Sequence, residues 1–531
     1  MLEENLRKAG KKMELSKKRV HMLLEGKPVM NQITVDDDRN VPDYKPDMLR
    51  IIESSGKIVL EDVKSGENQV HVKGKLQFMV MYVGEHGEIS IQSLESSIPL
   101  EETMHIEGLK TLDTVRLDTQ LEDLRIGIIN SRKMSIQAII TMMAVKEEVN
   151  QVELALEAVE KQDTENLKEE CEIMQLRVHK RDMMRVREEI ILPKSKNNIH
   201  EILWKEVSMN VKEIRLLQGK INVCGSLFVF VLYQGEGKIE WIREEIPFTK
   251  EVECDGCGEG MIPQIQSSLK SCELEVKTDD DVEERIILTD AVIDMDIRIY
   301  EEEMVTILSG IYSTSQELIP VTHTCEFQRL IGNNIAKCRL NHRLRIQRDE
   351  PRILQVCMES GRVGIDNIQT QEKGLLVEGT IDARILYVSA EDEMPFFVKQ
   401  IQLPFTQQID MNEMSQQGQY KVKAENIQLT STMIDSEEVE LKAMFDLAVF
   451  GIEPFEKDII EEVREAELDM ERLKNIAGIV VYVVHQGDTL FSIGKRYCMS
   501  IADIQKLNDL EGDTITPGMR LLICKNIGVE A

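Results

Sequence analysis

Aromatic residues are scarce in this chain of 531 residues, where they make up 4% and include two tryptophans. Long apolar runs are missing too: the longest, residues 227–233, has seven residues, whereas a membrane-spanning helix needs roughly 20. The first ten residues, MLEENLRKAG, carry charges throughout and lack the apolar core of a secretory signal. We therefore expect a soluble protein of the cytoplasm with no transmembrane segment.

The signatures of common catalytic sites are also missing from the sequence. It contains no GxxxxGK(S/T) phosphate loop, no HExxH metal motif and no GxSxG nucleophile turn. Acidic clusters at residues 36–38 and 279–281 offer weak cation ligands, but solvated loop acids are the simpler interpretation. We therefore predict that the protein is not an enzyme and has no catalytic residue, cofactor or metal site.

The ten cysteines are scattered, and one CxxC is present, formed by Cys254 and Cys257. In a cytosolic chain such spacing indicates buried thiols rather than disulfides. A zinc ribbon would need a second CxxC, and only Cys272 follows nearby. We interpret the motif as an ordinary turn, with a zinc or redox site as the alternative.

Charge is unbalanced, because 64 basic residues face 95 acidic ones, for a net charge of −31. A charge of this sign repels nucleic acid phosphates and anionic lipid head groups, so nucleic acid is not an expected partner. The same acidity also fits a solvated surface that keeps the chain soluble. The length itself predicts several domains rather than one core.

A repeated pattern, Gly-x-(Leu/Ile)-x-x-x-(Val/Ile)-(Met/Leu)-Tyr, organises the first 455 residues. It starts at Gly74, Gly225 and Gly379, which are 151 and then 154 residues apart, and it ends at Tyr82, Tyr233 and Tyr387. Apolar residues alternate along each copy, which predicts a core strand. The glycine shares the apolar face, which predicts a bulge or a close backbone approach.

A proline between two apolar residues follows each copy, at Pro99, Pro247 and Pro404. Because proline cannot donate a ladder hydrogen bond, it predicts an edge strand. Further β-like runs at residues 134–145, 291–300 and 439–450 make each copy mainly β, as a sandwich or a partly open barrel. We interpret the repeated Gly, Pro and Tyr as structural residues.

Helices are expected between and within these copies. Short ones are predicted at residues 5–24, 48–52 and 200–204. Residues 151–170, rich in Glu, Ala and Leu and free of Gly and Pro, predict a helical connector, and residues 456–478 a charged, helix-compatible linker. The predicted parts are repeat 1 (1–150), the connector (151–170), repeat 2 (171–310), repeat 3 (311–455), the linker (456–478) and a C-terminal module (479–526).

The three-fold pattern resembles the SPOCS domain of clostridial spore-coat assembly proteins. The residues that carry this resemblance lie at 41–52, 74–82 and 129–136 in the first copy, at 192–193 and 202–203 in the second and at 349–354 in the third. The resemblance covers most of residues 1–455.

The C-terminal module has a different character. A β-branched strand at residues 480–484 leads through a turn to a helix with Leu490, Ile493 and Tyr497 on one face. Ser500 and Asp503 have the spacing of a capping box that opens a second helix, which Asn508 ends. A turn at residues 516–519 then enters a strand at 520–523. The predicted order is β-α-α-β.

Residues 482–490, 507–508 and 515–523 resemble the LysM domain along its whole length. The resemblance implies a shallow groove for N-acetylglucosamine glycans between the loop after the first strand and the loop before the second. The predicted ligand- or partner-binding residues are Gly487, Asp488, Thr489, Asn508, Ile515, Thr516, Pro517 and Gly518. The alternative is that these residues serve the turns and the helix caps.

SPOCS-like repeats followed by a LysM module resemble the clostridial spore-coat morphogenetic proteins. This implies a mainly β, non-enzymatic scaffold of the mother cell, at the forespore surface or in the spore coat. Its LysM domain would dock on the ATPase of the coat's basement layer or on another coat protein. The alternatives are a surface protein that binds peptidoglycan and a general cytoplasmic scaffold.

Overall fold

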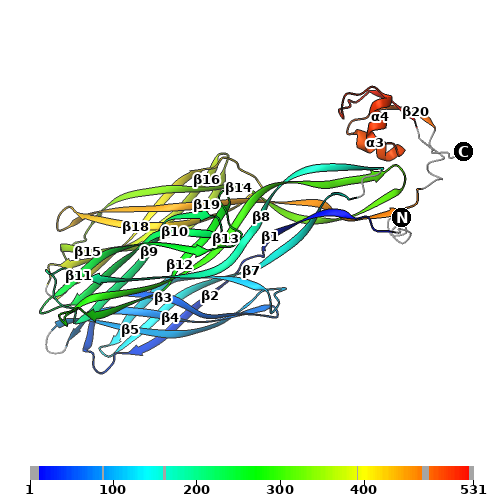
Figure 1. Cartoon of the computed structure of the whole chain (residues 1–531). Helices are drawn as coiled ribbons and strands as arrows, with labels where there is room; N and C mark the ends of the chain where they lie inside the picture. The colour runs from blue at the N-terminus through cyan, green and yellow to red at the C-terminus, as the bar shows by residue number, and fades with distance from the viewer. Residues whose placement is uncertain (1–10, 86–88, 160–162, 392, 469–477, 525–531) are drawn as a thin grey trace.

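The computed structural model describes residues 11–85, 89–159, 163–391, 393–468 and 478–524. Strands dominate, and they form three similar copies followed by a small module with two short helices (Figure 1). Among the described residues, no helix is long and apolar enough to cross a bilayer.

Each copy is a sandwich of two antiparallel sheets, as predicted. The second copy shows the plan most simply, with sheets in the orders β9-β10-β11 and β8-β13-β12. Its strands are β8 (Thr164–Ile191), β9 (Glu201–Leu217), β10 (Lys220–Gln234), β11 (Ile239–Glu253), β12 (Ile262–Thr278) and β13 (Glu284–Ser313). The third copy repeats it with β14 (Glu317–Arg345), β15 (Ile353–Gln371), β16 (Gly374–Ser389), β17 (Phe396–Asp410), β18 (Gln419–Met433) and β19 (Glu438–Ala466).

The first copy differs in having two strands where the others have one. It comprises β1 (Leu15–Glu25), β2 (Val29–Asn40), β3 (Asp47–Gly66), β4 (Gln69–Glu85), β5 (Ile89–His105), β6 (Thr114–Asn130) and β7 (Lys133–Ala158). β1 and β2 pair with successive parts of β7, and the break between them contains Gly26 and Pro28. Pro28 has no N–H for a ladder bond, which accounts for the interruption.

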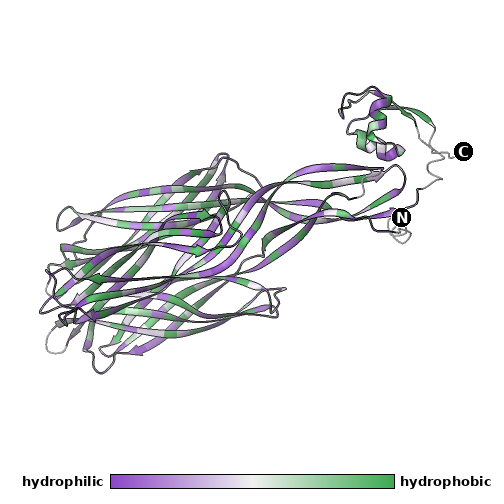
Figure 2. Ribbon diagram, in the orientation of Figure 1, coloured by the Kyte–Doolittle hydropathy of each residue, from purple (hydrophilic) through white to green (hydrophobic). Residues whose placement is uncertain are grey.

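The repeated strand is buried on both faces. In β10, Leu227, Val229 and Val231 point into the sandwich core, and Phe230 and Leu232 point into a second core shared with the other copies. This explains the apolar run at residues 227–233, which would be unusual in a strand with one wet face. Figure 2 shows apolar and polar residues alternating along many of the other strands.

The repeated glycines and prolines have the predicted roles. A Cβ on Gly225 would lie 2.5 Å from the Asn210 carbonyl oxygen, and the register of β10 against β9 shifts at this point. The glycine therefore marks both a bulge and a close approach. Pro247 lies on β11, an edge strand of its sheet, which confirms the prediction for the proline.

The repeated tyrosine ties each sandwich to a loop. Its buried hydroxyl donates to a backbone carbonyl 36 residues upstream in every copy: Tyr82 to Pro46, Tyr233 to Asn197 and Tyr387 to Pro351. The spacing is the same because the same loop precedes the same strands in each copy.

The three sandwiches close into one head. Strand β5 of the first copy contacts β9 of the second, and β17 of the third contacts β3 of the first. Arg243 on β11 pairs with Glu359 on β15 at 2.8 Å and joins the second copy to the third. The core between the copies contains Met79, Met81, Val83, Ile91, Leu203, Trp204, Phe230, Leu232, Cys357, Met358, Leu386 and Phe396.

A stalk extends from one end of the head (Figure 1). It consists of three two-stranded ribbons, one from each copy: β1 with β7, β8 with β13, and β14 with β19. Its core contains Val20, Met22, Val152, Leu154, Cys171, Ile173, Val305, Ile307, Phe327 and Ile459.

A buried ion cluster lies where the head meets the stalk and draws on all three copies. Arg298 pairs with Glu147 at 2.7 Å and with Glu25 at 3.0 Å, and both Arg298 and Glu147 have side chains that are 1% exposed. Arg116 and Lys421 also pair with Glu25. Burial would raise the pKa of Glu25, but the charges of Lys421, Arg116 and Arg298 outweigh it and hold the pKa at about 2.

The helices predicted outside the C-terminal module were wrong. Residues 11–24 of the range 5–24 lead into and form β1, residues 48–52 lie in β3, and 201–204 begin β9. The expected connector 151–170 is the end of β7 and the start of β8, and 456–466 belong to β19. Residues 5–10, 160–162 and 469–477 of these predictions lie outside the described residues. Pairing with neighbouring strands outweighed local helix propensity.

The C-terminal module has the predicted β-α-α-β order, with β20 (Ile479–Val483), α3 (Leu490–Tyr497), α4 (Ile501–Leu507) and β21 (Arg520–Cys524). β20 and β21 pair antiparallel. Its own small core includes Tyr482, Val484, Leu490, Ile493, Met499, Ile504, Leu521 and Ile523. The module rests at the tip of the stalk (Figure 1).

Candidate binding site in the C-terminal module

The loop between β20 and α3 is fixed by its own polar groups. Gly487 adopts a φ of +89°, which favours glycine, and Asp488 then turns back toward β20. The Asp488 carboxylate accepts hydrogen bonds from the Tyr482 hydroxyl at 2.7 Å and the His485 backbone N–H at 2.8 Å. The His485 N–H first, and then the Tyr482 hydroxyl, lower the pKa of Asp488. The carboxylate therefore stays charged and holds the turn.

Thr489 caps helix α3. Its hydroxyl accepts a hydrogen bond from the Ser492 N–H, and the Ser492 hydroxyl accepts one from the Thr489 N–H, both at 3.0 Å. Thr489 is therefore a helix cap, as the alternative interpretation predicted, and it forms a reciprocal capping box that the sequence spacing predicted only for the second helix. There, Ser500 is the N-cap as predicted, and its hydroxyl accepts from the Asp503 N–H at 3.0 Å.

The loop before β21 lies against the end of the first strand. The Gly518 N–H donates to the Val484 carbonyl at 2.8 Å, and the Val484 N–H donates to the Met519 carbonyl at 2.9 Å. Gly518 has a φ of +88°, which again favours glycine. The structure thus brings the two loops of the predicted groove together through backbone bonds.

The Asn508 side chain makes hydrogen bonds within the module. Its amide nitrogen donates to the Ile504 and Leu522 carbonyls at 2.9 and 2.8 Å, and its carbonyl oxygen accepts from the Leu522 N–H at 2.6 Å. The side chain joins the end of α4 to β21. It is a clamp rather than a group that faces a ligand.

Thr516 and Pro517 are exposed, as are Gly487, Thr489 and Gly518, whereas Ile515 packs partly on the module core. The surface around them offers backbone groups and one hydroxyl, which suits shallow hydrogen-bonded recognition. Sequence reasoning missed Arg496, which donates to the Tyr482 hydroxyl at 3.3 Å from the last turn of α3. No motif spacing pointed to it, because the pair is brought together by the fold.

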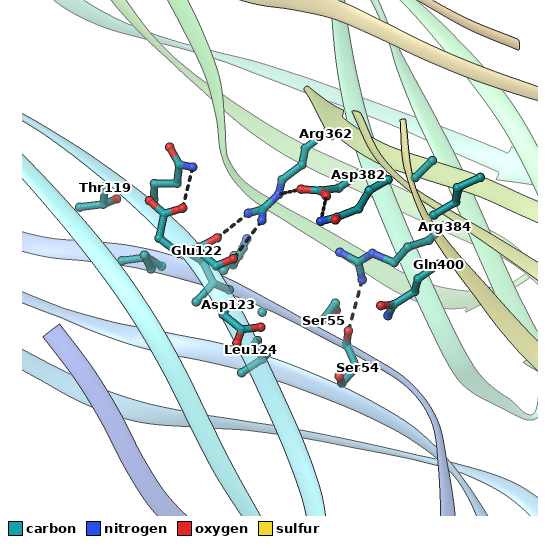
Figure 3. A pocket seen from close by; sticks show the side chains of 18 residues that line it. Ser54, Ser55, Thr119, Glu122, Asp123, Leu124, Arg362, Asp382, Arg384 and Gln400 are labelled. Atoms are coloured by element: carbon teal, nitrogen blue, oxygen red, sulfur yellow. Dashed lines mark hydrogen bonds and ion pairs between the residues drawn. The ribbon is translucent and has the colours of Figure 1, made fainter. Parts of the chain in front are cut away.

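A hollow lies between the first and third copies, with a volume of about 710 Å³ (Figure 3). Arg362 reaches across it and donates to the Leu121 and Glu122 carbonyls at 2.6 and 2.9 Å. Arg384 donates to the Glu53 carboxylate at 3.1 Å. Both guanidinium groups join the two copies, so we read this hollow as part of their interface.

The CxxC forms the predicted ordinary turn after β11. The Cys257 N–H donates to the Cys254 carbonyl at 3.1 Å, and the Cys257 thiol contacts the Leu217 carbonyl at 3.2 Å. Burial first, and then the neighbouring Cys257, raise the pKa of Cys254 to about 12, so its thiol stays protonated. Within the ranges that the structure describes, no group of three or more His, Cys, Asp or Glu could hold a metal ion.

Comparison with known families agrees with this architecture. A model of the SipL SPOCS domain matches residues 47–129, 198–277 and 352–434, and a model of the LysM domain matches residues 482–523. No curated protein and no solved structure matches the chain. Both matched families are non-catalytic binding domains. Together they support a sporulation-related coat protein with a LysM binding module. The chain therefore contains three SPOCS domains and one LysM domain, the combination that matches a SipL-like protein.

Proposed function

We propose that this protein is a non-enzymatic scaffold of the spore coat, which acts in the mother cell at the forespore surface. Its LysM domain docks on the ATPase of the coat's basement layer. The observation that carries the proposal is the arrangement of the chain, in which three SPOCS copies form one head and the LysM loops are exposed beyond the stalk.

Charge favours protein docking through this module. Five acids and five bases balance between residues 482 and 525, although the whole chain has a net charge of −31. A partner that approaches the LysM loops therefore meets a locally neutral surface, where desolvation costs less than at an acidic one. The exposed Thr516 and Pro517 lie where such a partner would make contact.

The test compares the full chain with two arginine variants in binding to the purified basement-layer ATPase. Thr516→Arg places a long charged side chain in the proposed groove and should weaken binding by about tenfold or more, the equivalent of roughly 1.4 kcal/mol. Ala502→Arg, on the exposed face of α4, is the control and should bind like the parent chain. Failure of the parent chain to bind the ATPase would refute the proposal. Unchanged binding by Thr516→Arg would show that the ATPase does not bind in the predicted groove.

The LysM match also supports glycan binding, and this gives the second candidate. A peptidoglycan-binding protein would pellet with insoluble peptidoglycan in a way that Thr516→Arg abolishes. A fluorescent fusion followed through sporulation separates the two functions, because the scaffold should collect around the forespore. Retention on peptidoglycan without recruitment to the forespore would favour the wall-binding function.

A further inference from the structure

The LysM module is seated on one of the three stalk ribbons. Tyr312, near the end of β13, donates its hydroxyl to the Met499 carbonyl at 2.8 Å in a buried contact. Its ring meets the Phe491 ring edge-on, with centroids 5.0 Å apart. One aromatic pair and one buried hydrogen bond thus join the second SPOCS copy to the module.

Two glycines make this approach possible. A Cβ on Gly310 of β13 would lie 3.1 Å from the Phe491 ring. A Cβ on Gly494 of α3 would lie 2.2 Å from the Tyr312 hydroxyl oxygen, which therefore occupies the space that any side chain there would need. The surfaces of ribbon and module fit each other at both positions.

A carboxylate from the same ribbon reaches the start of α4. Glu165 on β8 accepts a hydrogen bond from the Ile501 N–H at 3.1 Å. This N–H has no partner within its own helix, because the first turn of a helix leaves its N–H groups unpaired. Ser500 pairs the Asp503 N–H, and Glu165 adds a second partner from outside the module.

The described ends of the other two ribbons carry no aromatic residue comparable with Tyr312. β7 ends at Ala158 and β19 at Ala466, and small or aliphatic residues such as Ala155 and Val463 are buried near their ends. The seat uses Phe491, Gly494, Met499 and Ile501 of the module. These lie on α3, in the connection that follows it and at the start of α4, and the two loops of the predicted groove lie outside this set.

We propose that the tip of the β8–β13 ribbon is a dedicated receptor for the LysM module, with Tyr312, Gly310 and Glu165 as positioning residues. The receptor holds the module in one orientation and leaves its loops accessible. A partner bound by those loops is then held at a fixed place relative to the head. This last consequence rests on the proposed function, whereas the receptor itself does not.

Hydrogen exchange of the full chain tests the receptor without any partner. Gly310→Glu, which sets a charge against the Phe491 ring, should speed exchange at the Ile501 amide and in residues 308–313. Tyr312→Phe, which removes one hydrogen bond, should raise the opening equilibrium about fivefold. Tyr300→Phe, a buried tyrosine of the same strand that packs on Phe450, is the control and should leave the Ile501 amide unchanged. Hydrogen exchange at the amides of residues 225–233, in β10, shows whether the head of each variant stays folded.

If the Ile501 amide is equally protected from hydrogen exchange in the parent chain and in a folded Gly310→Glu variant, the receptor proposal is wrong. A second measurement adds the basement-layer ATPase to the parent chain. Protection at Ile501 and at residues 308–313 should persist in the complex, and its loss would overturn the fixed orientation. If the ATPase does not bind, the proposed function fails, but the first measurement still decides the receptor.

Discussion

At the scale of single residues, the recurring glycine of the SPOCS copies is needed because neighbouring atoms leave no space for a Cβ. Its backbone conformation does not itself require glycine. In the third copy, a Cβ on Gly379 would lie 2.3 Å from the Gly364 carbonyl oxygen and 2.6 Å from the Phe405 ring. Sequence reasoning predicted the close approach, because a glycine on an apolar strand face leaves space for something else. It did not identify the two neighbours, since they depend on the strand register.

Gly379→Ala should therefore lower the free energy of unfolding by about 1–3 kcal/mol, the usual cost of overpacking. Gly364→Ala is the matched control, because the nearest atom to its Cβ is the Thr380 carbonyl oxygen at 3.7 Å. Denaturant unfolding of both variants measures the difference. Equal losses would contradict the steric explanation.

Glu25 gives the protein a defined response to acid. Its pKa of about 2 in the folded chain lies below the value of 4.5 expected when unfolded, so the folded state binds fewer protons. The stability that it contributes, at most about 3 kcal/mol, is complete above pH 4.5 and is lost as pH falls toward 2.

Glu25→Gln should remove this stability at neutral pH and flatten the loss between pH 4.5 and 2. Glu259→Gln, at an exposed loop position, is the control and should keep the slope of the parent chain. Chemical unfolding at several pH values provides the measurement. A slope in Glu25→Gln as steep as that of the parent would show that other carboxylates cause the acid response.

At the scale of elements, the stalk shows where sequence reasoning failed and why. Val152 and Leu154 are buried and Glu153 is exposed, a period of two that continues β7. The Glu, Ala and Leu content of residues 151–170 favoured a helix instead, but β1 and β13 supply strand partners that composition cannot reveal. The LysM module was predictable because its caps and turns are local: Ser500 and Asn508 lie where their spacing indicated.

The stalk core is thin, so one large side chain should matter. Phe327 on β14 is 1% exposed and stacks on Phe455, with centroids 5.7 Å apart. Phe327→Ala should lower the free energy of local unfolding of the stalk by about 3–5 kcal/mol, and hydrogen exchange in the stalk strands should therefore become faster. Ile335→Ala, 60% exposed on the same strand, should change exchange little. Equal effects of the two variants would argue against a packed stalk core.

At the scale of the whole molecule, we expect the core between the copies to make the head unfold as one cooperative body. Trp204 is 1% exposed in this core, and Trp241 is half-buried beneath Lys196. Trp204→Ala should lower the unfolding temperature of all three sandwiches together, and Trp241→Ala should lower it less. Calorimetry distinguishes this from separate transitions, which would show that the copies unfold independently.

Joining three copies in one chain also sets the valency of the protein. Three separate subunits around the same axis would carry three equal tips and three modules, and they would cross-link their partners into a network. The single chain gives one ribbon Gly310 and Tyr312 and carries one LysM domain. On the proposed function, each body would present one module and recruit one partner copy through it, so that the head would decorate an assembled layer without bridging its subunits.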